Sequence, residues 1–128
     1  MEKVFIVDKV IEKLDFTQTT LEFGEYEQCK FIHCNFSSIS LAGFNFLDCE
    51  FVNCNLSMTQ LVKTSLKTVQ FTNCKLLGIQ FHTCDDFLFN VHFQECTLDY
   101  SSFANKKMPK TNFNSGSLKE VSFIGSQL

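Results

Sequence analysis

The sequence predicts an all-β solenoid, a rod in which short extended segments wind into stacked coils. The first observation is a five-residue period: from Phe16 onward, almost every fifth residue is Phe, Leu or another large apolar residue, here called a centre. The second is that the residue two positions before each centre is mostly small or apolar. The third is the use of 16 Phe and no Trp, which indicates one apolar shape used repeatedly. A period of five matches neither a helix nor an ordinary strand and is typical of a solenoid.

The centres form two runs separated by a short irregular segment. The first run contains Phe16, Leu21, Tyr26, Phe31, Phe36, Leu41, Phe46, Phe51, Leu56, Leu61, Leu66, Phe71, Leu76 and Phe81. The second run contains Phe93, Leu98, Phe103, Met108, Phe113, Leu118, Phe123 and Leu128. Because the centre and the residue two before it share an apolar character, we expect both to point inward, as alternate residues of an extended segment do.

Several pentapeptides show the pattern clearly, among them Cys-Asn-Phe-Ser-Ser at 34–38, Cys-Glu-Phe-Val-Asn at 49–53 and Cys-Asn-Leu-Ser-Met at 54–58. This order of a small residue, a polar residue, Leu or Phe and two variable residues resembles the motif of the pentapeptide-repeat family. The resemblance implies a right-handed quadrilateral parallel β-helix of five to six coils, in which four five-residue sides make one coil. Centres twenty residues apart then stack about 4.8 Å from one another, as for Phe31, Phe51 and Phe71.

The predicted organisation is an N-terminal capping segment at residues 1–13 followed by the β-helix at residues 14–128. The cap contains apolar residues that lie outside the clean repeat. Within the β-helix, Lys106 occupies a position that should point inward, and Pro109 follows it closely. We therefore expect local distortion there.

The second irregularity is an insertion between Phe81 and Phe93, which are twelve residues apart instead of ten. Two extra residues therefore lie within 84–91, where we expect a bulge or short loop. Leu88 is the predicted centre, which would leave Phe87 and Phe89 partly exposed.

The insertion also contains the candidate site of the chain. Its two carboxylates and two aromatic rings suggest a contact point for a protein partner, formed by Asp85, Asp86, Phe87 and Phe89. The alternative is a polar turn with both Phe rings folded back onto the coil.

All seven cysteines lie two residues before a position of the five-residue beat, at Cys29, Cys34, Cys49, Cys54, Cys74, Cys84 and Cys96. We interpret them as buried fillers, since free Cys behaves as a small apolar residue. A zinc site needs converging ligands, and thiols stacked in parallel columns do not converge. We expect no metal site and no cofactor. Three histidines, His33, His82 and His92, are expected at the surface.

The sequence contains no glycine-rich phosphate loop, no nucleophile elbow and no carboxylate pair placed for acid–base catalysis. We therefore expect no enzymatic activity and no catalytic residues. The chain has 11 basic residues, all Lys, and a net charge of −3. The lack of Arg argues against direct nucleic-acid binding. No apolar run is long enough for a membrane span, and unpaired cysteines favour the cytoplasm.

The predicted function is that of an interaction solenoid, which binds a protein partner through one face. The alternative comes from the resemblance, because the Phe- and Cys-rich repeats are similar to those of the quinolone-resistance pentapeptide proteins of bacteria. That resemblance implies a DNA mimic that binds DNA gyrase and changes quinolone sensitivity. The sequence ends on a centre, Leu128, without a polar cap. Either a second copy covers this coil end, which would make a homodimer, or further coils follow it in a longer chain.

Overall fold

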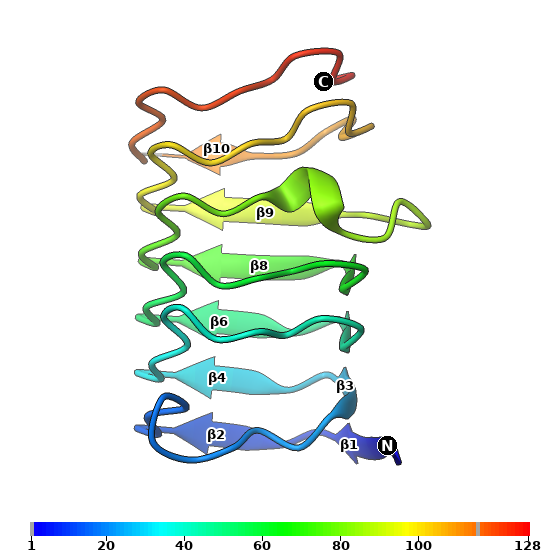
Figure 1. Ribbon diagram of the computed structural model, residues 1–128, viewed down its shortest axis with the longest axis vertical. Coiled ribbons are helices and arrows are strands. Elements are labelled where there is room, and N and C mark those ends of the chain that lie inside the picture. The colour runs from blue at the N-terminus through cyan, green and yellow to red at the C-terminus, as the bar shows by residue number, and fades with distance from the viewer. Residues whose placement is uncertain (1, 115) are drawn as a thin grey trace.

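The computed structural model describes residues 2–114 and 116–128, and it shows a rod of stacked coils (Figure 1). The described residues form short strands and one 3-10 helix, η1, at Phe81–Thr83. The strands are β1 (Val4–Val7), β2 (Val10–Glu12), β3 (Gly24–Glu27), β4 (Lys30–Ile32), β5 (Asn45–Leu47), β6 (Glu50–Val52), β7 (Ser65–Lys67), β8 (Val69–Thr72), β9 (Val91–Gln94) and β10 (Phe113–Asn114).

Four parallel ladders run along the rod and define its four faces. Face A is the four-stranded sheet β1-β3-β5-β7, and face B is the six-stranded sheet β10-β9-β8-β6-β4-β2. Faces C and D are made of single parallel bridges, which link Asn35 to Asn55 on face C and Ser40 to Gln60 on face D. These ladders confirm the quadrilateral parallel β-helix. Because face B has one strand per coil, the rod has six coils.

The predicted capping segment is itself built from strands. β1 pairs with β3 in the register Val4↔Gly24, and β2 pairs with β4 in the register Val10↔Lys30. Both offsets equal the twenty-residue spacing of later coils, such as Lys30↔Glu50. These strands therefore make two sides of the first coil and cover the core above them.

The core is a set of aromatic columns that follow the rod axis. On face B the rings of Phe31 and Phe51 lie 4.8 Å apart with planes 9° from parallel, and Phe51 stacks on Phe71 at 5.2 Å. Across the interior, Phe46 meets Phe51 edge-on at 5.4 Å and 70°. Each ring thus stacks along the axis and makes an edge contact across it, two geometries that aromatic pairs prefer. Burying one such side chain contributes roughly 1.5–3 kcal/mol.

The chain turns between faces at residues that lie two positions after a centre. Most of these corner residues have a left-handed backbone, with φ values such as 54° at Asn53, 50° at Asn73 and 57° at Thr68. Asn adopts this conformation at little cost, whereas a β-branched residue such as Thr is strained there. Polar residues at the corners therefore follow from backbone geometry as well as from exposure.

The segment around Lys106 is regular, so the expected distortion is wrong. Lys107 bridges Gln127 in the twenty-residue register, and Met108 N–H donates to the Gln127 carbonyl at 2.7 Å. Lys110 has the left-handed corner conformation with φ 66°. The reason is that Lys106 finds polar partners inside the coil, which are part of the candidate site.

Candidate protein-interaction loop

The two extra residues lie in a loop that follows η1 and leaves the rod. Ser65 still contacts Asp85, twenty residues later, whereas Val69 pairs with Val91, twenty-two residues later. The register therefore changes between these two pairs, in residues 85–90, here called the loop. Figure 1 shows the loop projecting sideways from the stack of coils at the level of β9.

A buried lysine from the next coil anchors the loop. The Lys106 side chain is 1% exposed, and its ammonium group donates a hydrogen bond to the Cys84 carbonyl at 2.7 Å. The same group forms an ion pair with Asp86 and lies 4.7 Å from the centre of the Phe89 ring. A buried ammonium group is stable only when it is paired and hydrogen-bonded. Lys106 meets that condition through groups supplied by the insertion.

Asp85 shapes the start of the loop. One of its carboxylate oxygens accepts a hydrogen bond from the Phe87 N–H at 3.0 Å, and the other accepts one from the Ser65 hydroxyl at 3.4 Å. The Phe89 N–H donates to the Asp86 carbonyl at 3.2 Å. An Asp side chain that binds the backbone two residues on is typical of a fixed turn. The loop is therefore held at both ends.

The tip of the loop is apolar and exposed. Phe87 is 65% exposed and Leu88 is 64% exposed, while Phe89 is only 8% exposed. The exposure of Phe87 agrees with the prediction, but the expected exposure of Phe89 and the choice of Leu88 as centre are wrong. Leu88 takes the left-handed corner conformation, with φ 55°, and the next residue turns back into the rod. Phe89, beneath the Lys106 ammonium group, supplies the inward side chain.

Two cavities flank the loop. One, of about 300 Å³, lies on the side of the sixth coil and is lined by Asp86, Phe87, Phe89, Asn105, Lys106 and Lys107. The other, of about 360 Å³, lies on the side of face A and is lined by Leu47, Lys67, Thr68, Leu88, Phe89 and Asn90. The first cavity combines apolar side chains with two lysines and the second combines them with one, a composition suited to the side chains of another protein.

Sequence reasoning missed two lysines of this site. Lys106 was interpreted as a source of distortion, although an inward Lys one coil after an insertion is itself a signal of a buried polar partner. Lys67 was not singled out, yet its ammonium group lies 5.2 Å from the centre of the Phe87 ring. Its position twenty residues before Phe87 is visible in the sequence. The site thus draws on three successive coils.

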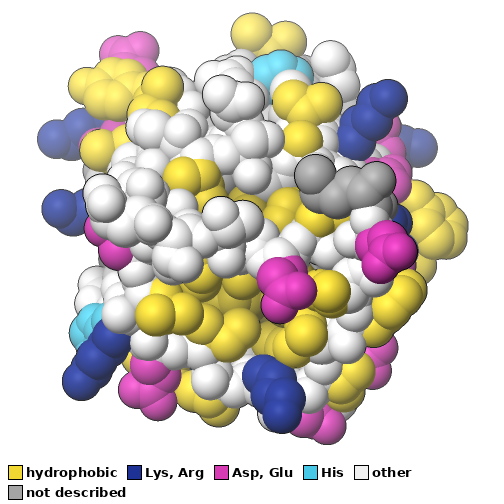
Figure 2. Space-filling model, turned by 60° about the horizontal axis from the view of Figure 1, so that its bottom comes forward, with side chains coloured by type: hydrophobic (Ala, Val, Ile, Leu, Met, Phe, Trp, Pro, Cys, Tyr) yellow, Lys and Arg dark blue, Asp and Glu magenta, His cyan; other side chains and the backbone are white. Residues whose placement is uncertain are grey.

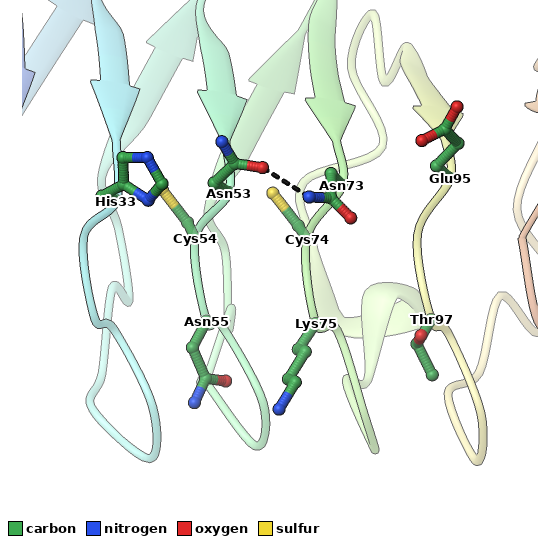
Figure 3. A pocket seen from close by; sticks show the side chains of 9 residues that line it. All are labelled: His33, Asn53, Cys54, Asn55, Asn73, Cys74, Lys75, Glu95 and Thr97. Carbon is green, nitrogen blue, oxygen red and sulfur yellow. Dashed lines mark hydrogen bonds between the residues drawn. The ribbon is translucent and has the colours of Figure 1, made fainter.

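A second concave surface follows the corner between faces B and C (Figure 3). This groove, of about 540 Å³, is bordered by His33, Asn53, Asn55, Asn73, Lys75, Glu95 and Thr97, with Cys54 and Cys74 along its floor. Asn73 donates a side-chain hydrogen bond to Asn53, its neighbour one coil away. The groove is open, and Asn53 and Asn73 bond to each other along the rod instead of pointing to a common centre, as the polar groups of a ligand site do.

The cysteines are buried, as predicted. Each thiol in the column of Cys54 and Cys74 donates to a backbone carbonyl of the preceding coil, at 3.3 Å and 3.2 Å. Hydrogen bonds with the neighbouring thiols, and then burial, raise the pKa of Cys74. Burial raises the pKa of Cys49 and of Cys84 to about 12. In residues 2–114 and 116–128, no group of three or more His, Cys, Asp or Glu side chains is placed to hold a metal ion.

Charges of both signs alternate along the rod. The fourth and sixth coils are basic, with Lys63, Lys67, Lys75, Lys106, Lys107, Lys110 and Lys119. Lys30 and Glu50 form an exposed ion pair at 3.6 Å. Figure 2, with the N-terminal end turned forward, shows Lys and acidic side chains interspersed around a group of hydrophobic ones. None of the helices in the described part of the chain is long and apolar enough to cross a membrane.

Comparison with solved structures shows the same architecture in QnrB1, described as a plasmid-mediated fluoroquinolone resistance protein. A trypsin-treated variant of QnrB1 matches at a TM-score of 0.57 and 20% identity, over 96% of this chain and 64% of that chain. Full-length QnrB1 matches at 0.53 and 16%, over 96% of this chain and 74% of that one. The chain thus spans less than two thirds of the first of these structures, and the likeness shows the fold alone.

The sequence itself gives the family. No curated protein sequence matches this chain significantly. A match to the pentapeptide repeat region covers residues 24–103, which is more than half of the chain. The four ladders, the inward centres and the twenty-residue register are the structure that such repeats encode. The chain therefore belongs to the pentapeptide repeat family.

Proposed function

We propose that this protein is a non-enzymatic scaffold that binds a protein partner through face A and the loop at residues 85–90. The observation that carries the proposal is the anchoring of an exposed apolar tip by a fully buried ion-pairing lysine, Lys106. An exposed Phe on a mobile loop would lose conformational freedom on binding, whereas a loop that is already fixed loses little. Buried free thiols favour the reducing cytoplasm, where we also place the protein.

The predicted contact residues have different roles in this proposal. Phe87, with Leu88 beside it, is the apolar group offered to the partner, because aromatic anchors dominate many protein interfaces. Asp85 and Asp86 hold the loop in shape through the backbone and Lys106. Phe89 supports the loop from inside. Binding should therefore depend most strongly on Phe87.

A photo-crosslinking residue at position 87 tests the proposal. The matched control carries the same residue in place of Ile124, which is 76% exposed and lies on face D. We expect position 87, and not position 124, to capture one protein in cells. That protein is then purified, and its affinity is measured for Phe87→Ala and Ile124→Ala. Equal capture from both positions, or an affinity that Phe87→Ala leaves unchanged, would contradict the proposal.

The alternative function is a DNA mimic that binds DNA gyrase. Such a mimic needs a continuous acidic surface along the rod, and the lysines of the fourth and sixth coils interrupt it here. This distribution of charge favours the scaffold. A gyrase supercoiling assay with and without a quinolone separates the two functions. Restored supercoiling in the presence of the drug would support the mimic, whereas no effect at a large molar excess of folded protein would exclude it.

A further inference from the structure

One outward column of face A is self-complementary in charge and polarity. It contains residues spaced twenty apart, namely Val7, Glu27, Leu47, Lys67 and Phe87. The first four are paired in register on β1, β3, β5 and β7. The Lys67 ammonium group continues the column to the Phe87 ring, at 5.2 Å. From Leu47 outward, the column has opposite charges on its two sides and then an apolar side chain on each.

We propose that face A binds a second copy of this chain, antiparallel, about a two-fold axis at Leu47. A two-fold interface uses the same surface on both copies, so each contact occurs twice. Leu47 then meets Leu47 of the second copy, Glu27 meets its Lys67, and Val7 meets its Phe87. The ion pairs lie about 4.8 Å from the axis along the rod, and the apolar pairs lie farther out, where the loop of each copy meets β1 of the other.

Exposure and unpaired charge support this occupant. Val7 and Leu47 on the strands and Phe87 on the loop are 48%, 37% and 65% exposed, so one column offers three apolar side chains together with its two charges. Glu27 and Lys67 form no ion pair with any residue in the described part of the chain. A second copy supplies an opposite charge to both residues and covers all three apolar side chains.

Faces B and D lack this arrangement of charges. On face B, Lys30 and Glu50 are neighbours and already pair with each other at 3.6 Å. On face D, the corresponding outward column contains one carboxylate and no lysine: its residues are Glu22, Ala42, Val62, His82, Ala104 and Ile124. Face C also has opposite charges, Asp15 and Lys75, on either side of Asn35 and Asn55. Its two central residues are polar, whereas face A has the apolar Leu47 at the midpoint.

The interface is small, so the dimer is weak and depends on protein concentration. Five coils at about 4.8 Å each give a contact roughly 24 Å long, and its width is that of one five-residue side of the coil. That area is below the ~1,200 Å² of a standard stable interface. Near the axis, Asp48 of one copy lies opposite Asp48 of the other, and the two carboxylates repel each other. Asp48 is at an exposed corner, where water and salt screen this repulsion.

This inference concerns the same face as the proposed function, but its test does not involve a foreign partner. A loss of self-association can therefore be measured separately from a loss of binding to a foreign partner. A second copy on face A also covers Phe87, so a foreign partner would compete with the dimer.

The first experiment is sedimentation equilibrium of the purified full chain over a wide range of concentrations, with charge-reversed variants. We expect self-association that weakens at high salt, and about a tenfold or larger loss of affinity in Glu27→Lys and in Lys67→Glu. The double variant Glu27→Lys/Lys67→Glu restores the opposite charges and should restore the dimer. Lys75→Glu makes the same change of charge on face C and should have no effect.

The second experiment places a new thiol at the proposed axis. In Leu47→Cys the two new sulfurs face each other, so mild oxidation should give a covalent dimer. The seven natural cysteines are buried and do not compete. Val62→Cys, on face D and 47% exposed, is the matched control and should stay monomeric. A chain that is monomeric at all concentrations, a dimer insensitive to both charge reversals, or equal crosslinking at positions 47 and 62 would overturn the proposal.

Discussion

Lys106 and Asp86, twenty residues apart, form an ion pair in which the ammonium side chain is 1% exposed and the carboxylate side chain is 88% exposed. The pair joins the interior of the sixth coil to the surface of the loop. Without Asp86, the buried ammonium group would keep the Cys84 carbonyl as a hydrogen-bond acceptor but would lose its opposite charge. The shape of an exposed loop is therefore determined from inside the rod.

Replacing Lys106 with Met tests this role. Met fills a similar volume but leaves the Cys84 carbonyl without its donor and Asp86 without its cation, which should cost about 1–3 kcal/mol. We expect faster amide hydrogen exchange in the loop, at Phe87 and Phe89, measured by NMR, with little change on face B. Lys107→Met, at the exposed neighbour, is the control. Unchanged exchange in the loop of Lys106→Met would show that the backbone turn alone fixes it.

A large-to-small change at Phe51 tests the aromatic columns. Phe51 stacks between Phe31 and Phe71 and has edge contacts to Phe36 and Phe46. Phe51→Ala should lower the free energy of unfolding by about 3–5 kcal/mol, because it leaves a cavity between two stacked rings. Phe51→Leu should cost about 1.5 kcal/mol or less if the column repacks. Urea denaturation measures both, and equal costs would indicate that ring stacking contributes little.

Relief of backbone strain at a corner should stabilise the rod. Thr68 is exposed and has a left-handed backbone with φ 57°, which is unfavourable for a β-branched residue. Thr68→Asn should raise the free energy of unfolding by about 0.5–1 kcal/mol, as judged from the cost of left-handed conformations. Thr72→Asn makes the same change within β8, where β-branched residues are favoured. This variant should have a lower free energy of unfolding. A loss of stability at both positions would show that strain at the corner is unimportant.

The repeat fixes most of this fold because every coil must meet the same requirement. The five-residue spacing predicts which residues point inward, and the resemblance to the pentapeptide-repeat family implies four sides per coil. Together they predict that a centre such as Phe51 stacks on centres twenty residues away, as the register shows. The insertion is different. Its length follows from the sequence, but which residue returns to the interior depends on Lys106, in the next coil, and on the backbone turn at Leu88. The five-residue period describes each coil by itself, so it does not predict a contact between the insertion and a lysine of the next coil.

Tyr26 should make the rod sensitive to high pH. Burial, followed by the nearby charge of Glu22, raises the pKa of Tyr26 to about 12, and its hydroxyl donates to the Glu22 carbonyl. An unfolded tyrosine ionises near pH 10, so between about pH 10 and 12 the folded chain binds more protons than the unfolded chain. The contribution of Tyr26 is therefore complete below pH 10 and is lost as the pH rises toward 12.

Two measurements check this dependence on pH. Tyr100 is the other tyrosine of the chain, so in a Tyr100→Phe variant the tyrosinate absorbance reports Tyr26 alone. We expect it to appear near pH 12 in the folded protein and near pH 10 in urea. Between pH 9 and 12, the free energy of unfolding should fall more steeply with pH in the natural chain than in Tyr26→Phe. The other titrating groups are common to both proteins, so the difference reports Tyr26. Tyrosinate that forms near pH 10 in the folded rod would mean that water reaches the Tyr26 hydroxyl despite its position under β5.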